Sequence, residues 1–113
     1  MPNSILTSIK KLLGITEGYT HFDADIIMHI NSCFMILSQL GVGPEEGFAI
    51  SDASAVWSDF LPAGTNLEAV KTYVYQKVKL LFDPPQSSAV LDAMKRSVDE
   101  FEWRLNVQAE SVS

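Results

Sequence analysis

The chain has 113 residues, 47% of them hydrophobic and 19% charged, which suits one domain with one buried core and excludes an intrinsically disordered protein. Its formal net charge of −6 argues against a protein that binds nucleic acid through phosphate contacts, because those contacts need clustered lysine and arginine. The single cysteine, Cys33, excludes an internal disulfide and is expected to be a buried, unreactive thiol, as in a reducing cytosol.

The ends of the chain and its hydropathy show no targeting or membrane segment. The N-terminal residues lack a secretory signal pattern, and no apolar run reaches the roughly 18 residues that span a bilayer. We therefore expect a protein in solution, with no membrane partner and a single domain over residues 1–113. Its ordered core is expected over about 4–106, with a frayed tail at 107–113.

Two helices are predicted in the first third of the chain. Residues 5–13 place apolar side chains on one face, between a capping Ser4 and Gly14, which suits the left-handed end of a helix. A second helix begins at Asp23, which is expected to cap it, and ends before Gly41. This helix is apolar around most of its circumference, which predicts a central position with other elements around it.

Residues 41–64 are the least regular stretch, because four glycines and two prolines interrupt them. Phe48 and Ile50 favour a short extended piece or hairpin, and residues 54–60 favour one or two helical turns. Connections of this length are uncommon and often functional, so we expect this one to reach a neighbouring molecule.

Two longer helices follow. Thr65 and Glu68 match a T-x-x-E capping box at the start of the third helix. Asp83-Pro84-Pro85 ends it, and Ser87 or Ser88 caps the fourth. Apolar residues of the fourth helix recur at a near-heptad spacing that a long antiparallel partner would bury. The sequence thus predicts an all-α fold, a small bundle of about four helices with a long irregular connection between the second and third.

Charge is divided unevenly along the chain. Between Lys11 and Lys71 lie eight acidic residues and no lysine or arginine, whereas the remainder holds all eight basic residues and six acidic ones. Two interpretations stay open: a solvated acidic face, or an acidic surface that meets the basic part of a neighbouring copy.

No catalytic, metal or cofactor site is predicted. His21, Asp23 and Asp25 are close in sequence and rich in oxygen ligands, but helix capping explains the two aspartates more simply. His29 and Cys33 lie four residues apart without a third residue to orient the base or a Gly-rich turn to stabilise an oxyanion. We therefore expect a protein that is not an enzyme.

Two short segments carry residue types that dominate the energetics of protein interfaces, although core packing is the alternative, above all for Phe60. The candidates for contact with another subunit or partner are Trp57, Asp59, Phe60, Glu102, Trp103 and Arg104. The candidates for an acidic surface that faces a channel or a neighbouring subunit are Glu45, Glu46 and Asp52.

Several of these segments together resemble a known family. The segments FDADIIMHIN, FMILSQLGVGPEEGF, WSDFL, VKTYVYQKVKLLFDPP and EFEWRLN, in this order, resemble the small head–tail connector (adaptor) proteins of long-tailed bacteriophages that infect Gram-positive bacteria. The resemblance spans Ile5 to Asn106, and VKLLFDPP and EFEWR are its most specific parts.

The resemblance implies a structural, helical protein without enzymatic activity. It implies a ring of about a dozen copies beneath the portal protein, which extends the DNA channel and docks stopper or tail-completion proteins. DNA would pass through without specific binding, and the protein, assembled in the cytoplasm of the host bacterium, would lie at the head–tail junction of the virion. The alternative interpretation is a small acidic regulator, such as a DNA-mimicking inhibitor of a host enzyme.

Overall fold

Four α-helices and one short 3-10 turn make up the part of the chain that the computed structural model describes, residues 4–112. The helices are α1 (Ile5–Leu12), α2 (Asp23–Gln39), α3 (Thr65–Phe82) and α4 (Ser88–Val112), and the 3-10 turn, η1, spans Trp57–Asp59. In this part of the chain the only β pairing is an isolated bridge between Ser4 and Val56. The predicted all-α bundle of about four helices is therefore confirmed.

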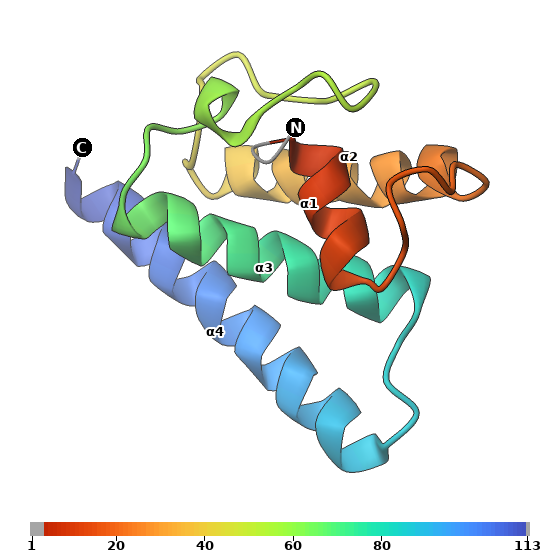
Figure 1. Cartoon of the computed structure of the whole chain (residues 1–113). Coiled ribbons are helices and arrows are strands. Elements are labelled where there is room, and N and C mark those ends of the chain that lie inside the picture. The colour runs from red at the N-terminus through yellow and green to blue at the C-terminus, as the bar shows by residue number, and fades with distance from the viewer. Residues whose placement is uncertain (1–3, 113) are drawn as a thin grey trace.

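α2 forms the centre of the core. It packs against α3 and α1, and residues 42–60 cross over it (Figure 1). Phe34 of α2 is fully buried, and its ring lies 4.9 Å from that of Phe48, 4.7 Å from that of Phe60 and 6.3 Å from that of Trp57. These aromatic contacts hold the irregular connection against α2. Removing one such side chain fully from water stabilises a fold by about 1.5–3 kcal/mol.

The connection between α2 and α3 is fixed by hydrogen bonds as well. The amide of Asn31 donates to the Ile50 carbonyl at 2.9 Å and accepts from the Ile50 N–H at 2.8 Å, so a side chain on α2 pairs with the extended backbone as a strand would. The Trp57 indole N–H donates to the Ser8 hydroxyl at 2.9 Å. The greater part of this connection therefore packs on the protomer's own core.

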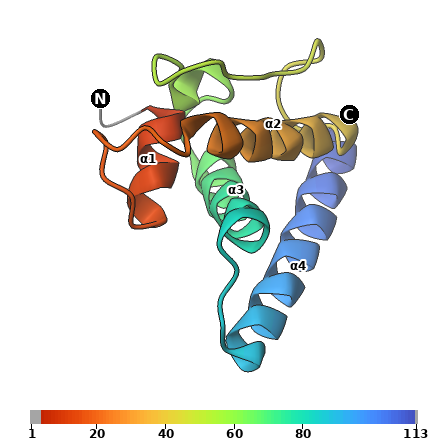
Figure 2. The same ribbon diagram turned by 90° about the vertical axis from the view of Figure 1, so that its right-hand side faces the viewer.

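α3 and α4 lie side by side over part of their length and diverge toward the segment that joins them, residues 83–87, which we call the elbow (Figures 1 and 2). As predicted, α3 ends at Asp83, whose backbone is no longer helical (φ −150°, ψ 71°), and Ser87 caps α4, accepting from the Val90 N–H at 3.4 Å. α4 is not buried evenly along its length. Val98 and Leu105 are buried, whereas Val90, near its start, is half exposed.

The predicted capping box at the start of α3 is wrong. Thr65 is the first residue of α3 rather than its cap: Gly64 occupies that position, and no side chain bonds the cap. Glu68 instead lies 3.3 Å from Lys71, one turn further along α3. α4 continues to Val112, and the Asn106 amide donates to the Leu40 carbonyl at 3.2 Å, which joins the later part of α4 to the end of α2. Ser113 lies outside the described residues.

The predicted cap at Asp23 is also wrong, because this side chain binds Lys10. The Lys10 ammonium is almost fully buried and lies 2.8 Å from the Asp23 carboxylate. It also donates to the carbonyls of Glu17 at 3.1 Å and Tyr19 at 2.7 Å. One lysine on α1 thus pairs with a carboxylate at the start of α2 and donates to two carbonyls of the α1–α2 loop, and these contacts offset the cost of burying its charge.

We expect Lys10→Met to lower the free energy of unfolding by about 3 kcal/mol, since the Asp23 carboxylate and two carbonyls lose their cation. Urea denaturation followed by circular dichroism measures the loss. The matched control is Lys11→Met, at an exposed position on the same helix, which should change stability by less than ~0.5 kcal/mol. Equal stability of the two variants would contradict the role assigned to Lys10.

Gly43 provides a second test of the packing at the end of α2. Its φ is +93°, and a Cβ there would contact the Phe60 ring, 2.7 Å from Cζ. We expect Gly43→Ala to destabilise the fold by at least about 2 kcal/mol in the same urea assay, from left-handed strain plus overpacking. Gly47→Ala has similar backbone strain (φ +88°) but open space around the Cβ, so it should cost only about 1 kcal/mol. An equal loss in both variants would contradict the Phe60 contact.

Candidate functional site

A group of three interacting titratable side chains, Tyr73, Lys77 and Glu102, joins α3 to α4. The Tyr73 hydroxyl donates to the Glu102 carboxylate at 2.8 Å, and the Lys77 ammonium lies 3.5 Å from the same oxygen. Burial, and then the bond to Glu102, raise the pKa of the Tyr73 phenol. Glu102, predicted from the sequence as a contact with another molecule, is thus half-buried and paired within its own protomer.

Cys33 of α2 lies close enough to this group for the charges of Lys77 and Glu102 to act on its thiol. The thiol is buried in the core and unreactive. Burial raises the pKa of the Cys33 thiol to about 12, and Lys77 only partly opposes that rise. A thiol that keeps its proton at neutral pH is a poor nucleophile. The His29–Cys33 pair therefore has no activated sulfur, and the Tyr73–Glu102–Lys77 group stabilises the contact between helices.

The suspected metal ligands at the start of α2 have another role. Asp23 is paired with Lys10, as described above, and the ring of His21 packs edge-on against Phe22 at 4.8 Å. Over residues 4–112, no three His, Cys, Asp or Glu side chains are grouped so that they could hold a metal ion.

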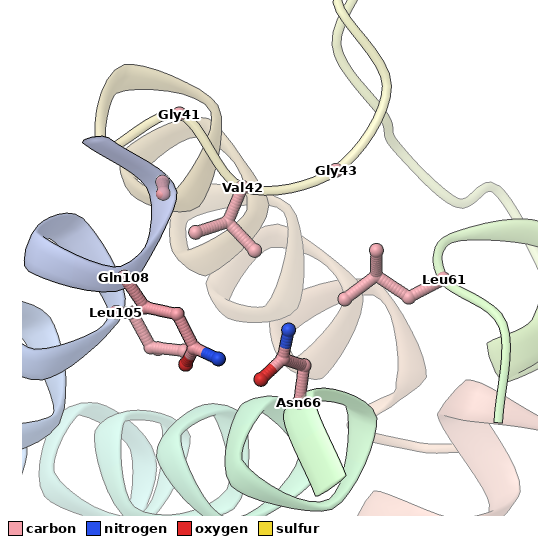
Figure 3. Close-up of a pocket in the computed structure, with 8 residues that line it drawn as sticks. Gly41, Val42, Gly43, Leu61, Asn66, Leu105 and Gln108 are labelled. Carbon is pink, nitrogen blue, oxygen red and sulfur yellow. The ribbon is translucent and has the colours of Figure 1, made fainter. Parts of the chain in front are cut away.

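A pocket of about 290 Å³ lies where the end of α2 meets the start of α3 and the end of α4 (Figure 3). Val42, Leu61 and Leu105 supply apolar walls, and the amides of Asn66 and Gln108 face each other across it. None of the described residues that line the pocket is titratable. It can make apolar contacts and amide hydrogen bonds, but it holds no acid, base or nucleophile.

A larger depression, of about 500 Å³, opens where α3 and α4 diverge, and we call it the α3–α4 hollow. Leu80 and Leu81 of α3 and Leu91 and Val98 of α4 form its apolar lining. Its charged residues are Lys77, Lys95 and Asp99. A second groove, of about 470 Å³, lies against a later part of α4 and includes Phe101, Trp103 and Val107.

Some of the predicted interface residues are buried in the structure and others are exposed. Trp57, 3% exposed, and Phe60 are core residues, and Asp59 accepts from the Val56 N–H at 3.0 Å at the start of η1. Trp57 and Phe60 therefore offer almost no surface to a partner in this fold. Trp103 is 64% exposed, and Arg104 is also exposed, 3.6 Å from Glu100.

The predicted acidic residues of the connection lie at the surface. Glu45, Glu46 and Asp52 are all exposed. Asp52 accepts hydrogen bonds from the side chain and the backbone N–H of Ser54, and these bonds lower the pKa of its carboxyl group. The three residues thus present negative charge at the surface of the connection, the segment that crosses over α2 (Figure 1).

Sequence reasoning missed an apolar surface on α2. Met28 and Met35 are 59% and 58% exposed, on the side of the helix opposite Ile26 and Leu37, so α2 is not surrounded as predicted. The signal for this surface was present in the helical register, because both methionines adjoin the polar stripe of the helix. Their apolar character led to their assignment to the core.

The raised pKa of Cys33 generates a test against pH. The folded thiol has a pKa of about 12 against an ordinary value of 9.0, so above pH 9 the unfolded chain binds fewer protons than the folded one. The free energy of unfolding should therefore fall as pH rises, by up to about 1.4 kcal/mol per pH unit from this group. We expect Cys33→Ala, measured by urea denaturation between pH 8 and 10, to lose stability less steeply than the wild type. If the free energy of unfolding fell equally steeply with pH in the two proteins, the raised pKa of Cys33 would be contradicted.

Comparison with known proteins identifies the kind of molecule that carries these surfaces. None of the described helices has the length and apolar character to cross a membrane. No curated protein and no solved structure matches the chain. A family model described as "Phage connector protein" matches residues 5–112, nearly the whole chain. The chain therefore belongs to the phage connector protein family, whose members are structural components of the virion.

Proposed function

We propose that this connector protein is a ring-forming subunit of the head–tail junction. Copies of it, about a dozen by family resemblance, lie beneath the portal protein, extend the DNA channel and provide a platform for stopper or tail-completion proteins. The observation that carries this proposal is the family match over residues 5–112. Assembly takes place in the host cytoplasm, and the protein acts as a structural part without catalysis.

The distribution of charge supports assembly between unlike surfaces. The acidic connection, with Glu45, Glu46 and Asp52, and the elbow lie at opposite ends of the molecule (Figure 1). Near the elbow, the end of α3 and the start of α4 hold both signs of charge: the basic residues Lys77, Lys79, Lys95 and Arg96, and the acidic residues Asp83, Asp92 and Asp99. Lys79 is paired with Asp83 at 3.0 Å and Lys77 with Glu102 at 3.5 Å. A closed ring of identical subunits needs two different, complementary faces on each copy. An acidic end and an end of mixed charge are two different faces of this kind, and a difference in charge helps to fix which faces meet.

The acidic connection also suits a surface that DNA passes. Glu45, Glu46 and Asp52 are exposed, and no lysine or arginine occurs between Lys11 and Lys71 to bind phosphate. Negative side chains along a channel repel the DNA backbone and keep it from adhering. We assign these three residues to the channel or to the contact with an adjacent subunit.

Trp103 and Arg104 are the candidates for contact with the portal or a tail protein. A tryptophan 64% exposed beside an apolar groove is costly to leave in water, and tryptophan and arginine are the residue types that most often dominate binding energy. Asp59 and Glu102 are secondary candidates because their carboxylates already have partners in the protomer.

The test uses the full chain and the portal protein encoded by the same phage. We expect analytical ultracentrifugation and electron microscopy to show rings, or a complex with portal rings, that weaken as salt rises. Trp103→Ala should reduce this association at least about tenfold. Tyr19→Ala, at another half-exposed aromatic residue, should leave it unchanged.

Two results would contradict the proposal. One is a wild-type protein that remains monomeric at every concentration and does not associate with the portal. The other is a host enzyme as its sole partner in infected cells, which would support the acidic regulator instead.

A further inference from the structure

α4 buries few side chains for its length. Of its side chains that the structure describes, only Val98 and Leu105 are buried, although the helix has 25 residues. α2 and α3 are shorter, and each buries five side chains. Because the burial of apolar side chains is the main favourable term in folding, α4 is attached to the core less firmly than α2 or α3.

The space beside α4 is incompletely filled. The three pockets described above, of about 290, 500 and 470 Å³, are all lined in part by α4. Leu105 lines the first and the third, and Val98 lines the second. The two buried side chains of α4 thus border pockets as well as the core, so they make fewer dispersion contacts than fully packed side chains would.

Polar contacts supply much of the remaining attachment of α4 to α3. Glu102 accepts from the Tyr73 hydroxyl and pairs with Lys77, as described above. The Ser97 hydroxyl donates to the side-chain oxygen of Gln76 at 2.8 Å. Water can bond these groups when the helices separate, so the net stabilisation from each contact is modest.

The elbow can act as the hinge of such a separation. Its backbone hydrogen bonds are local: the Asp83 N–H donates to the Lys79 carbonyl at 3.0 Å, and the Leu91 N–H donates to the Ser87 carbonyl at 2.9 Å. Neither bond crosses from α3 to α4, so both remain when the helices move apart. The two helices already diverge toward the elbow (Figure 2), and hinges are a few loop residues of this kind.

We propose that α4 is an arm that opens from α1, α2 and α3 as one unit, while the rest of the protomer stays folded, and that it opens when the protein binds the portal. Units with few buried apolar contacts are the ones that open locally. Trp103 and Arg104, the candidates for contact with the portal, lie on α4, so movement of the arm changes their position. The opening is a property of the protomer alone, and only its role in binding rests on the proposed function.

Native-state hydrogen exchange, followed by NMR on the full-length protein, tests the opening. Amides of residues 98–106 in α4 should exchange at least about hundredfold faster than those of residues 30–37 in α2, each relative to its intrinsic rate. Tyr73→Phe removes the hydroxyl that bonds Glu102 in the closed form, so exchange in α4 should become about tenfold faster.

A variant outside α4 separates this opening from global unfolding. Phe48→Leu weakens the packing on Phe34, which stays intact when only α4 opens. Exchange in α2 should therefore become at least about fivefold faster, whereas exchange in α4 should change less than about twofold. If Phe48→Leu accelerated both helices equally, or if Tyr73→Phe left α4 unchanged, α4 would not open as a separate unit and the inference would be wrong.

A disulfide clamp tests the role of the opening in binding. A Cβ built on Gly41, at the end of α2, would lie 3.3 Å from the Cβ of Ala109 on α4. Cβ atoms joined by a disulfide are about 3.5–4.5 Å apart, so Gly41→Cys with Ala109→Cys brings two thiols within reach of each other. The oxidised clamp holds α4 on α2. The reduced form of the same variant is the matched control, because it has the same backbone strain at residue 41 (φ +87°).

We expect the oxidised form to bind portal rings at least about tenfold more weakly than the reduced form, measured by analytical ultracentrifugation. Equal binding by the two forms would show that α4 does not need to open, and its role in binding would be wrong. If the wild type did not bind the portal either, the proposed function would fail and this role with it. The exchange experiment would still decide whether α4 opens.

Discussion

The packing of aromatic rings around Phe34 is the constraint on which the other features of this protein depend. Residues 42–60 contain only the short turn η1, and they keep their place because Phe48, Trp57 and Phe60 surround Phe34 on α2. A long irregular connection is usually mobile, since its backbone has few fixed partners. Here the buried rings order it. The acidic residues of the connection are therefore held on a fixed surface of the molecule.

Local sequence patterns predicted the helices well because the signals that end them are local. Ser4 caps α1 and accepts from the Thr7 N–H at 3.2 Å, Gly14 and Gly41 have the positive φ expected after a helix, and the prolines stop α3. The failures occur where a distant partner competes with a local motif. Asp23 matched a cap but is held by Lys10, thirteen positions earlier, which no local pattern reveals.

The candidate surfaces were harder to predict, because exposure depends on the arrangement of helices. Trp57 and Phe60 lie in a segment without periodicity, so the sequence gives no sign of which way they point. Glu102 was grouped with Trp103 because they adjoin, yet one bonds Tyr73 and the other faces solvent. Met28 and Met35 belong to a helix so apolar that its uncovered side resembles its covered one.

The relative lengths of α3 and α4 explain why this protomer has unsatisfied apolar surface. α4 has 25 residues and α3 has 18, so α4 is about 10 Å longer. Asp83-Pro84 turns the chain away from α3, and the first turns of α4 then lack a neighbour within the protomer. The first turns of α4 add little stability to a monomer, because Val90 is half exposed there and the hollow beside them is open. The same helix is useful to a protein whose core is completed by copies of itself, and that is the physical reason to expect assembly.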